Sequence, residues 1–585
     1  MKKLLLAIAL LLPMVAYADR VKADKAQEIA EKFLNPSGTK AGGKTLSLVW
    51  RGEKPGETVS VDPAFYVFNA DGGGFVVVSG EDAMTPILAY SMTQAFPAAD
   101  NMAPGLKDWM EGLQAAVAQV RREGLKPTAA VREAWTDAAA SGPARDGGDE
   151  VVIETALWDQ GDPYNRLCPE VDGGKSVTGC AATAIAIIMY NYKHPTKGTG
   201  NLPSYNYTTD KGNDRHQDGK KLGKEYDWDN MLMSYKGSFT DAQANAVAEL
   251  MLDVGIMAKM QYNSTGSAAT TSSAAFRLSE FMGYDKSMRH FEKGYMSAED
   301  WIEMISEEID EGRLVLYSAR DNTGGHAFVC DGYRKSDNYL RFNWGWSGSG
   351  NGFFAISDMA GFTIHNNAVF GIAPDHGGEE PKGYVGYTTL STTQKTITKG
   401  EPFTVTVKEI VTQGGSVKEA VLTLAKLSGA GEIREFPSDA LLINLDTGYY
   451  YPSQDFNVTI NTDILPGDYL LPIYTYGDVT DSEPDDWYQA LWYQDGGGNE
   501  KMVLMSEDSV LESTRFNFNA TTRVMTITTL AETTVTLTDS KGKDWSSAVK
   551  GSGGTFTVNG KELTKGTYTV TLTINGVSKS FDVTL

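Results

Sequence analysis

Residues 22–124 carry a hydrophobic pattern that predicts a compact unit of helices and strands. Apolar residues at helical spacing predict one helix near its start and one near its end, marked by Ala26, Ile29, Ala30 and Phe33 and by Leu106, Met110, Leu113, Val117 and Val120. Between them, stretches rich in strand-forming residues predict four strands, over residues 45–50, 64–69, 75–79 and 86–91. We therefore expect an α+β domain in this part of the chain.

The pattern changes where this unit ends. Residues 125–150 are rich in Ala, Pro, Gly and charge and show no sustained apolar period. Such a composition predicts an exposed linker that proteases can reach. A cut in this linker would separate the first unit from the rest of the chain.

Residues 151–375 begin with helical patterns and finish with alternating ones. Residues 181–190 are apolar nearly all round, which is typical of a central buried helix. Ser297 and Asp300 form a capping-box start for a helix that runs through residue 310. Alternating runs then predict strands over residues 313–319, 326–333, 339–344 and 352–356. A helical half followed by an antiparallel half predicts a second α+β domain.

Beyond about residue 380 the chain turns to Thr, Val, Tyr and Gly with short alternating runs. These runs include residues 403–407, 420–424 and 469–474 in one stretch, and 524–529, 533–538 and 567–573 in another. Their spacing favours β-sandwiches. We expect two all-β domains of the Ig-like sandwich type, over residues 379–513 and 514–585.

Composition changes this picture mainly by exclusion. The 585 residues correspond to about four folding units, and 41% hydrophobic residues supply enough apolar material for several cores. The 75 acidic residues outnumber the 52 basic ones, and the resulting charge of −23 repels phosphate backbones and anionic membranes. We therefore expect no nucleic-acid partner, while the oligomeric state stays open.

The N-terminal segment, residues 1–18, has the pattern of an export signal. Residues 1–3 give a positive start, residues 4–15 are apolar, and residues 16–18 (Ala-Tyr-Ala) have the form that signal peptidase cleaves. The apolar run is shorter than the roughly 20 residues that span a bilayer, and no cysteine follows it to carry a lipid anchor. No later segment is predicted to span a membrane, so we expect a protein that is secreted or held at the cell surface.

Several common chemistries lack their motifs. The six histidines form no HExxH pair, and the chain has no Cys-x-x-Cys, no Walker-type glycine loop and no GxSxG elbow. We therefore expect no metal, no cofactor and no serine-hydrolase mechanism.

One cysteine stands in a setting that favours a nucleophile. The three cysteines are too few for a disulfide scaffold, and their odd number leaves at least one thiol without an internal partner. Cys180 runs directly into the apolar residues 181–188, which places it at the first turn of the predicted helix. Unpaired amide groups and the positive end of the helix dipole stabilise a thiolate there. The alternative is an inert buried thiol, which is the usual state of an unpaired cysteine.

A thiolate nucleophile needs a base that returns the proton to the leaving amine, and histidine serves both steps. His326 lies at the start of a predicted buried strand, behind Gly324 and Gly325, which would let a substrate backbone come close. The ordinary interpretation of His326 is a structural histidine with satisfied hydrogen bonds.

Two further segments could support this pair. At the end of the next predicted strand, the Asn343 side chain could accept the imidazole N–H, and the Trp344 indole could shield that bond from water. Gln160 lies twenty residues before Cys180 and could donate to an oxyanion together with the Cys180 amide. The alternatives are a glycine loop with core tryptophans and a polar turn residue.

Together, these segments resemble the streptopain family of papain-like cysteine peptidases. The similar segments are residues 160–165, 178–184, 324–329 and 343–346. Further segments resemble the family's pro-segment and a part near its substrate cleft, at residues 65–69, 74–80 and 86–91 and at residues 266–268 and 272–273. The resemblance covers roughly residues 22–375, and its four separated motifs are in the family's order.

The resemblance implies a role for each candidate residue. Cys180 would be the nucleophile, His326 the general base and acid, and Gln160 the oxyanion donor. Asn343 and Trp344 would support His326, and the resemblance leaves open how they share that support.

The resemblance also implies a zymogen whose partners are protein or peptide substrates and its own pro-segment. The expected domains are a signal peptide, an inhibitory pro-segment with linker and a papain-like peptidase domain, over residues 1–18, 19–145 and 146–378, followed by the two β domains. The family's preference for an apolar residue two before the scissile bond makes Gly325 and Ser267 candidate substrate-binding residues.

Some features depart from the resemblance. Cys168 and Cys330 are extra thiols, and about 200 C-terminal residues are added. Because a disulfide between Cys168 and Cys180 would abolish activity, we expect the enzyme to be most active under reducing conditions. Residues 563–585 faintly resemble C-terminal sorting domains of secreted bacterial proteins, so the last domain is a candidate for sorting or attachment.

Two other classes of function stay open at this point. Cell-wall amidases and transglutaminases also place a cysteine at a helix start, so the mechanism alone does not exclude them. A surface adhesin whose sandwiches bind glycans or proteins would use the aromatic residues of 485–488 and 492–493, although such residues more often belong to a sandwich core.

Overall fold

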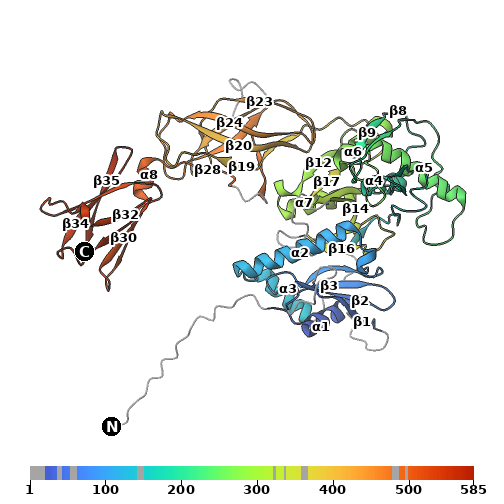
Figure 1. Ribbon diagram of the computed structural model, residues 1–585, viewed down its shortest axis with the longest axis horizontal. Coiled ribbons are helices and arrows are strands. Elements are labelled where there is room, and N and C mark those ends of the chain that lie inside the picture. Colours follow the sequence, from blue (N-terminus) through green and yellow to red (C-terminus); the bar gives the residue numbers. More distant parts are fainter. Residues whose placement is uncertain are drawn as a thin grey trace, which may run out of the picture. The chain divides into compact units, whose positions relative to one another are not determined.

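The chain forms two compact units, Met1–Pro381 and Lys382–Leu585, the second drawn in orange to red in Figure 1. The computed structural model describes residues 20–35, 43–52, 62–140, 150–320, 325–334, 338–356, 366–476, 487–494 and 499–585. Within these ranges, no helix is long and apolar enough to cross a membrane. The export signal expected in residues 1–18 lies outside the described residues.

The first part of unit 1 is a small antiparallel sheet between two helices. Its elements are α1 (Ala23–Leu34), β1 (Leu46–Trp50), β2 (Phe65–Ala70), β3 (Phe75–Ser79), β4 (Ile87–Ser91), η1 (Ala99–Asn101) and α2 (Pro104–Glu123). Successive residues of a strand point to opposite faces, so one face of the sheet packs on Phe33 of α1 and the other on Leu106 and Trp109 of α2. The two helices and four strands expected from the hydrophobic pattern are all present.

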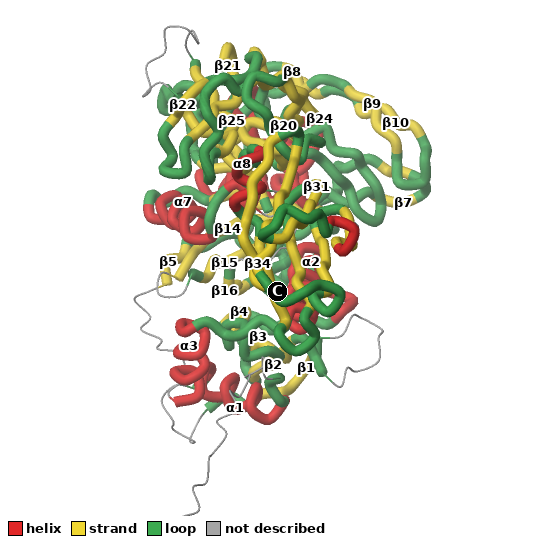
Figure 2. The backbone as a smooth tube through the Cα atoms, turned by 90° about the vertical axis from the view of Figure 1, so that its left-hand side faces the viewer, coloured by secondary structure: helices red, strands yellow, loops and turns green. Residues whose placement is uncertain are grey.

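The expected linker contains a helix, α3 (Ala129–Ala140), that the composition did not predict. The buried Trp135 side chain anchors it, because its Nε1 donates to the Met84 carbonyl at 2.8 Å and the Lys25 ammonium lies 5.0 Å from its ring centre. Figure 2 shows α3 beside α1. Alanine is the best helix former, so one aromatic anchor suffices to dock this segment. Most described side chains of this segment are exposed, as expected of a linker, but the segment is a docked helix and not an irregular connection. Residues 141–149 lie outside the described ranges.

The second part of unit 1 is built around the buried helix α4. Its elements are β5 (Glu150–Val152), β6 (Glu170–Val171), β7 (Gly174–Lys175), α4 (Cys180–Tyr192), β8 (Asn201–Leu202), β9 (Tyr205–Thr208), β10 (Asp214–Gln217), β11 (Lys220–Lys221), η2 (Trp228–Asn230), α5 (Asp241–Met257), α6 (Thr271–Phe281), β12 (Arg289–Glu292), η3 (Lys293–Tyr295), α7 (Ala298–Asp310), β13 (Val315–Arg320), β14 (Gly325–Arg334), β15 (Tyr339–Asn343), β16 (Gly352–Ala355) and β17 (Asn367–Phe370). Residues 181–189 of α4 are all buried, as their apolar sequence predicts, and they share a core with Ala327 and Val329 of β14.

One sheet runs through both parts of unit 1. Its described strands follow the order β1-β2-β3-β4-β16-β15-β14-β13-β17-β12, and β5 pairs with β14. The two parts join where β4 pairs with β16, with Phe353 opposite Tyr90 and Phe354 opposite Ala89. The rings of Tyr90 and Phe353 stack across this join with their centres 5.1 Å apart. The first unit expected from the sequence is therefore packed onto the second as an extension of its sheet.

Unit 2 consists mainly of sheets packed face to face. Its elements are β18 (Tyr384–Tyr387), β19 (Thr389–Ser391), β20 (Pro402–Gln413), β21 (Val417–Leu427), β22 (Ile433–Glu435), β23 (Leu441–Leu445), β24 (Tyr450–Thr459), β25 (Tyr469–Thr475), β26 (Tyr488–Gln489), β27 (Leu491–Trp492), β28 (Met502–Val503), α8 (Glu507–Glu512), β29 (Arg515–Asn519), β30 (Val524–Thr528), β31 (Thr534–Asp539), η6 (Ser546–Ala548), β32 (Val549–Ser552), β33 (Thr555–Asn559), β34 (Thr567–Ile574) and β35 (Val577–Thr584). Val405 of one sheet and Leu424 of another share the first core, and Met525 and Val570 share the second in the same way. Alternating runs such as those of β20 and β34 thus bury every second side chain against these cores.

Candidate active site

Cys180 is the first residue of α4 and is partly exposed. Gly179, the N-cap residue, has a φ of 88°, a left-handed conformation that favours glycine. A β-carbon added to Gly179 would lie 2.6 Å from Sδ of Met260, so a larger residue would also clash. The unpaired amides at the start of a helix favour a thiolate at Cys180 over a thiol.

The structure places the Cys180 and His326 side chains next to each other, and each shifts the pKa of the other. Burial alone would raise the pKa of the Cys180 thiol, but the neighbouring His326 side chain outweighs burial and lowers the pKa. For His326, burial alone would lower the pKa, but the neighbouring Cys180 thiolate outweighs burial and raises the pKa. The two shifts favour a thiolate and an imidazolium side by side.

The other ring nitrogen of His326 is held by the backbone of Trp344. His326 Nε2 lies 2.9 Å from the Trp344 carbonyl oxygen. Because a carbonyl only accepts, Nε2 must carry the proton, and Nδ1 is the nitrogen left for Cys180. The Trp344 indole is fully buried beside Phe328, with ring centres 4.6 Å apart, and its Nε1 donates to the Gly350 carbonyl at 3.0 Å.

The Asn343 side chain makes different contacts from those expected. Its Nδ2 donates to Thr155 Oγ1 and to the Ala156 carbonyl, both at 2.9 Å, and its Oδ1 accepts the Gly345 N–H at 3.1 Å. The hypothesis that this amide accepts the imidazole proton directly is corrected, because the Trp344 carbonyl accepts it. The fully buried Asn343 side chain is engaged by the segment that precedes Gln160 and by the turn after β15.

The remaining candidate residues border the Cys180–His326 pair. The Gln160 carbonyl accepts the Thr178 N–H at 3.1 Å, which fixes the Gln160 backbone beside the residues that lead into Cys180. Ser267 is buried, and its Oγ donates to the Val177 carbonyl at 2.7 Å. Gly325, the first residue of β14, is exposed next to His326.

The first part of unit 1 also reaches this pair, through residues that sequence reasoning missed. A β-carbon added to Gly105, in the first turn of α2, would lie 2.7 Å from Cδ2 of His326 and 2.9 Å from the Trp344 ring. Asp108, one turn further along α2, adds to the raised pKa of His326 through its charge. The apolar pattern of α2 marked its buried face, but nothing in the pattern indicated what that face would cover.

The two other thiols differ from Cys180. Cys168 and Cys330 are buried and unpaired, and burial raises the pKa of Cys168 to about 12 and that of Cys330 still further. Both therefore stay protonated near neutral pH. Among the described residues, no group of three or more His, Cys, Asp and Glu is placed to hold a metal ion.

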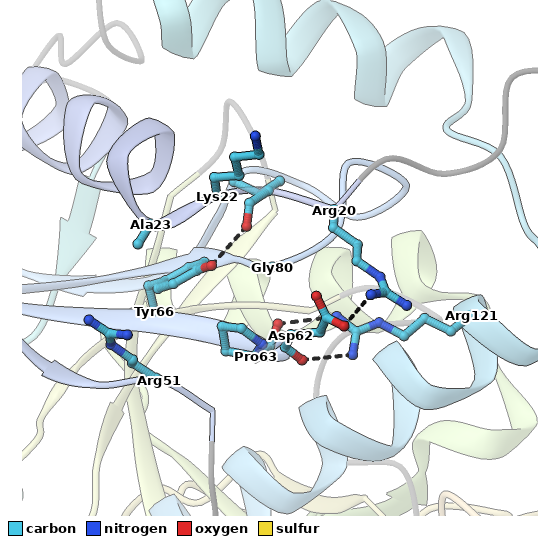
Figure 3. A pocket seen from close by; sticks show the side chains of 10 residues that line it. Arg20, Lys22, Ala23, Arg51, Asp62, Pro63, Tyr66, Gly80 and Arg121 are labelled. Carbon is cyan, nitrogen blue, oxygen red and sulfur yellow. Dashed lines mark hydrogen bonds and ion pairs between the residues drawn. The ribbon is translucent and has the colours of Figure 1, made fainter. Parts of the chain in front are cut away.

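A cavity of about 370 Å³ lies away from Cys180, at the start of the described chain (Figure 3). Arg121 bonds the Glu81 carboxylate and the carbonyls of Asp62 and Pro63, and Arg20 pairs with the Asp62 carboxylate. These contacts tie the start of the described chain to the last turn of α2. The described polar groups of this cavity thus stabilise the first part of unit 1.

A partly exposed cysteine at the start of a buried helix, beside a histidine on the facing strand, fits a Cys–His enzyme that acts on amide bonds, a class that includes the cysteine peptidases. Residues 158–354 match the Peptidase C10 family, and residues 18–117 match the Spi protease inhibitor family. Streptopain of Streptococcus pyogenes serotype M1 is 32% identical over 343 residues, which cover 53% of this chain and 80% of streptopain. The chain therefore belongs to the peptidase C10 family and is a cysteine-type endopeptidase with an inhibitor-like pro-segment.

Two other relatives match different shares of the chain. The thiol protease/hemagglutinin PrtT of Porphyromonas gingivalis is 30% identical over 403 residues, which cover 64% of this chain and 44% of PrtT. The chain thus spans less than half the length of PrtT. A solved fragment of prointerpain A from Prevotella intermedia is 28% identical and has a TM-score of 0.46, covering 56% of this chain and 99% of the fragment.

Proposed function

We propose that this protein is a secreted endopeptidase, made as a zymogen, that hydrolyses peptide bonds in proteins through Cys180 and His326. The juxtaposition of these side chains, with Cys180 at the start of α4 and His326 on the neighbouring β14, carries the proposal, because it lowers the pKa of the thiol and raises that of the imidazole. A thiolate beside an imidazolium supplies both the nucleophile and the acid that peptide hydrolysis needs.

The proposed reaction has two steps. The Cys180 thiolate attacks the scissile carbonyl, and the oxyanion is stabilised by the Gln160 side chain and the Cys180 N–H. His326 gives its proton to the leaving amine, which departs as the C–N bond breaks and leaves an acyl-enzyme. The neutral imidazole then takes a proton from water, and the hydroxide cleaves the thioester and restores the thiolate. Trp344 holds the imidazole through its carbonyl.

The proposed domains follow from this activity. Residues 1–18 direct export and residues 19–145 inhibit, with α2 lying on His326 and the linker as the activation site. Residues 146–378 form the papain-like peptidase domain. We further propose that it prefers an apolar residue two before the scissile bond, with Gly325 and Ser267 beside that pocket.

The two C-terminal domains, 379–513 and 514–585, are proposed to be Ig-like sandwiches outside the catalytic machinery. Their paired sheets and shared cores support this proposal. The last domain is a candidate for sorting or attachment at the cell surface.

Self-processing of the full chain tests the nucleophile. Wild-type protein in the presence of a thiol should cut its own linker and digest casein, whereas Cys180→Ala should stay full length. Cys168→Ala is the matched control and should process normally, because the Cys168 thiol is buried and protonated. Processing by Cys180→Ala would reassign the nucleophile, and cleavage of peptidoglycan instead of casein would favour a cell-wall amidase. N-terminal sequencing of the product locates the activation site.

A further inference from the structure

The peptide group between Trp344 and Gly345 makes two hydrogen bonds, one through its carbonyl and one through its N–H. Its carbonyl accepts the proton of His326 Nε2, and its N–H donates to Asn343 Oδ1 at 3.1 Å. A peptide whose N–H is engaged by an acceptor has a more negative carbonyl oxygen, since hydrogen bonds in a chain polarise one another. Asn343 therefore acts on His326 through this peptide, even though its side chain bonds other groups.

The chain of hydrogen bonds continues from Asn343 into the protein. Asn343 Nδ2 donates to Thr155 Oγ1 at 2.9 Å, and Thr155 Oγ1 donates to Asp331 Oδ2 at 2.5 Å. In every one of these hydrogen bonds, the group nearer the imidazole donates and the group nearer the carboxylate accepts. Asn343, Thr155 and Asp331 are all nearly or fully buried, so water does not compete with these bonds.

Asp331 reaches this position because β14 bulges. Cys330 pairs with Phe342 and Gly332 pairs with Arg341, which leaves Asp331 as the extra residue without an opposite partner on β15. Gly332 permits the close approach of β5, since a β-carbon there would lie 2.6 Å from the Val151 carbonyl. The bulge therefore brings Asp331 to Thr155, just beyond the end of β5.

Several charged or titratable groups face Asp331. Arg341 on β15 places Nη1 at 2.8 Å from its carboxylate, and Glu154 and the Cys330 thiol are near. Burial raises the pKa of Asp331 to about 6, while Arg341 and the Thr155 hydroxyl oppose that rise. Arg341 and the Thr155 hydroxyl thus favour the charged form of the carboxylate.

We propose that Asp331 is a remote carboxylate that orients and polarises His326 through Thr155, Asn343 and the Trp344–Gly345 peptide. Within this chain of hydrogen bonds, His326 alone touches the reacting atoms. The positioning residues are Asp331, Thr155 and Asn343. This chain of hydrogen bonds from His326 to Asp331, called the relay below, keeps the proton on Nε2, leaves Nδ1 for Cys180 and stabilises the imidazolium. The inference rests on the proposed function of His326.

Thr155 is the residue at which to cut this relay, because its replacement leaves every charged group in place. Asp331→Asn would leave the partly buried Arg341 without its counter-ion and could simply unfold the protein. Thr155→Val keeps the shape and removes the hydroxyl, while Thr155→Ser restores the hydroxyl. Thr423→Val is a matched control, since it removes another buried threonine hydroxyl, in unit 2.

The first measurement does not need activity. In full-length Cys180→Ala protein, labelled histidines report the tautomer and pKa of His326 by NMR, with the signal assigned by its loss in His326→Gln. Thr155→Val should lower the pKa of His326 by roughly half a unit to one unit and increase the Nδ1–H tautomer, as expected for one lost link in a polarised chain. Thr155→Ser and Thr423→Val should match the parent.

The second measurement uses chains that retain Cys180. Thr155→Val should lower kcat about three- to tenfold, the size of one net hydrogen bond, with KM little changed and the alkaline limb of the pH profile moved to lower pH. Thr155→Ser should recover the parent profile. If Thr155→Val folds and leaves the His326 titration, tautomer and pH profile unchanged, the relay is overturned and Thr155 merely ties β5 to β14. Self-processing by Cys180→Ala would instead overturn the proposed function, while the NMR comparison would still decide the relay.

Discussion

Gly105 of α2 lies against the imidazole edge of His326, so closely that an added β-carbon would come within 2.7 Å of Cδ2. The same position would meet the Trp344 ring at 2.9 Å. The absence of a side chain at Gly105 therefore lets the start of α2 cover the histidine without moving it. We expect inhibition by this pro-segment to act, at least in part, by occupying the space beside His326.

Gly105→Leu should weaken this inhibition. The leucine cannot fit against His326 and Trp344, so the first turn of α2 must move away. We expect the full chain to begin self-processing several-fold earlier, as judged by gel analysis over time. Glu111→Leu puts the same residue on the exposed side of α2 and should process at the wild-type rate. An unchanged lag in Gly105→Leu would contradict the occupation of this space by α2.

The Cys180–His326 pair predicts an unusual pH dependence of thiol alkylation. The pKa of Cys180 is lowered and that of His326 is raised, so the thiolate–imidazolium pair exists at pH values between the two. In the full-length chain at pH 6, iodoacetamide should modify Cys180 at least roughly tenfold faster than in His326→Ala, in which the rise in thiol pKa caused by burial is no longer opposed by His326.

Cys168 and Cys330 serve as internal controls for this experiment. Both thiols are buried with raised pKa values, so mass spectrometry should find them unmodified at pH 6. Equal alkylation of Cys180 with and without His326 would rule out the ion pair.

Asp285 predicts how the stability of unit 1 depends on pH. Its buried carboxylate accepts the N–H groups of Ser287, His376 and Gly378 at 2.8, 3.0 and 3.0 Å. Burial alone would raise the pKa of Asp285, but these bonds outweigh burial and hold the pKa well below its ordinary value. A depressed folded pKa stabilises the protein above the unfolded value near 3.9, and this contribution is lost as the pH falls through the folded value.

Asp285→Asn should therefore lower the free energy of unfolding by about 2 kcal/mol at pH 7, the cost of losing a charged acceptor. The difference from the parent should shrink below about pH 4. Urea unfolding of the Cys180→Ala chain measures both values without self-digestion. Asp229→Asn, at a fully exposed carboxylate, should change little. A difference that stays constant down to pH 2 would exclude this role of Asp285.

Helix α3 predicts where proteases cut. Arg132 is exposed but lies in α3, which the buried Trp135 ring docks onto the sheet. Limited trypsin treatment of the Cys180→Ala chain should spare Arg132, and Trp135→Ala should open it to cleavage. Trp135→Phe keeps an aromatic ring but loses the bond to Met84, so intermediate protection is expected. Rapid cutting at Arg132 in the parent chain would show that α3 does not protect the linker.

The local hydrophobic pattern predicted those helices and strands whose formation depends mainly on their own sequence. The alternating runs at residues 403–407 and 567–573 gave strands in which every second side chain is buried, and the apolar run after Cys180 gave α4. The helices α5 and α6 were missed. α6 begins with Thr271, Ser272 and Ser273, which are poor helix formers, and it is held by Ala274, Ala275 and Leu278 in the core. Tertiary packing decides such segments, and no local pattern reports it.

The same limit applies to the site. Cys180 and His326 each stand in a recognisable local setting, so their pairing could be predicted. Thr155 and Asp331 are 176 residues apart, and only the bulge in β14 brings them together. The predicted hydrogen bond from His326 to the Asn343 side chain is absent for a related reason. The turn after β15 directs the Trp344 carbonyl at the imidazole instead.

Because β4 pairs with β16, the proposed maturation must separate two paired strands as well as cut a peptide bond. Cutting the linker breaks none of the hydrogen bonds between these strands, so the severed pro-segment should leave slowly and more readily at low protein concentration. Once it leaves, Phe353 and Phe354 of β16 lose their partners on β4. An uncovered strand edge pairs readily with other chains. We therefore expect the bound pro-segment also to limit aggregation of the newly folded enzyme.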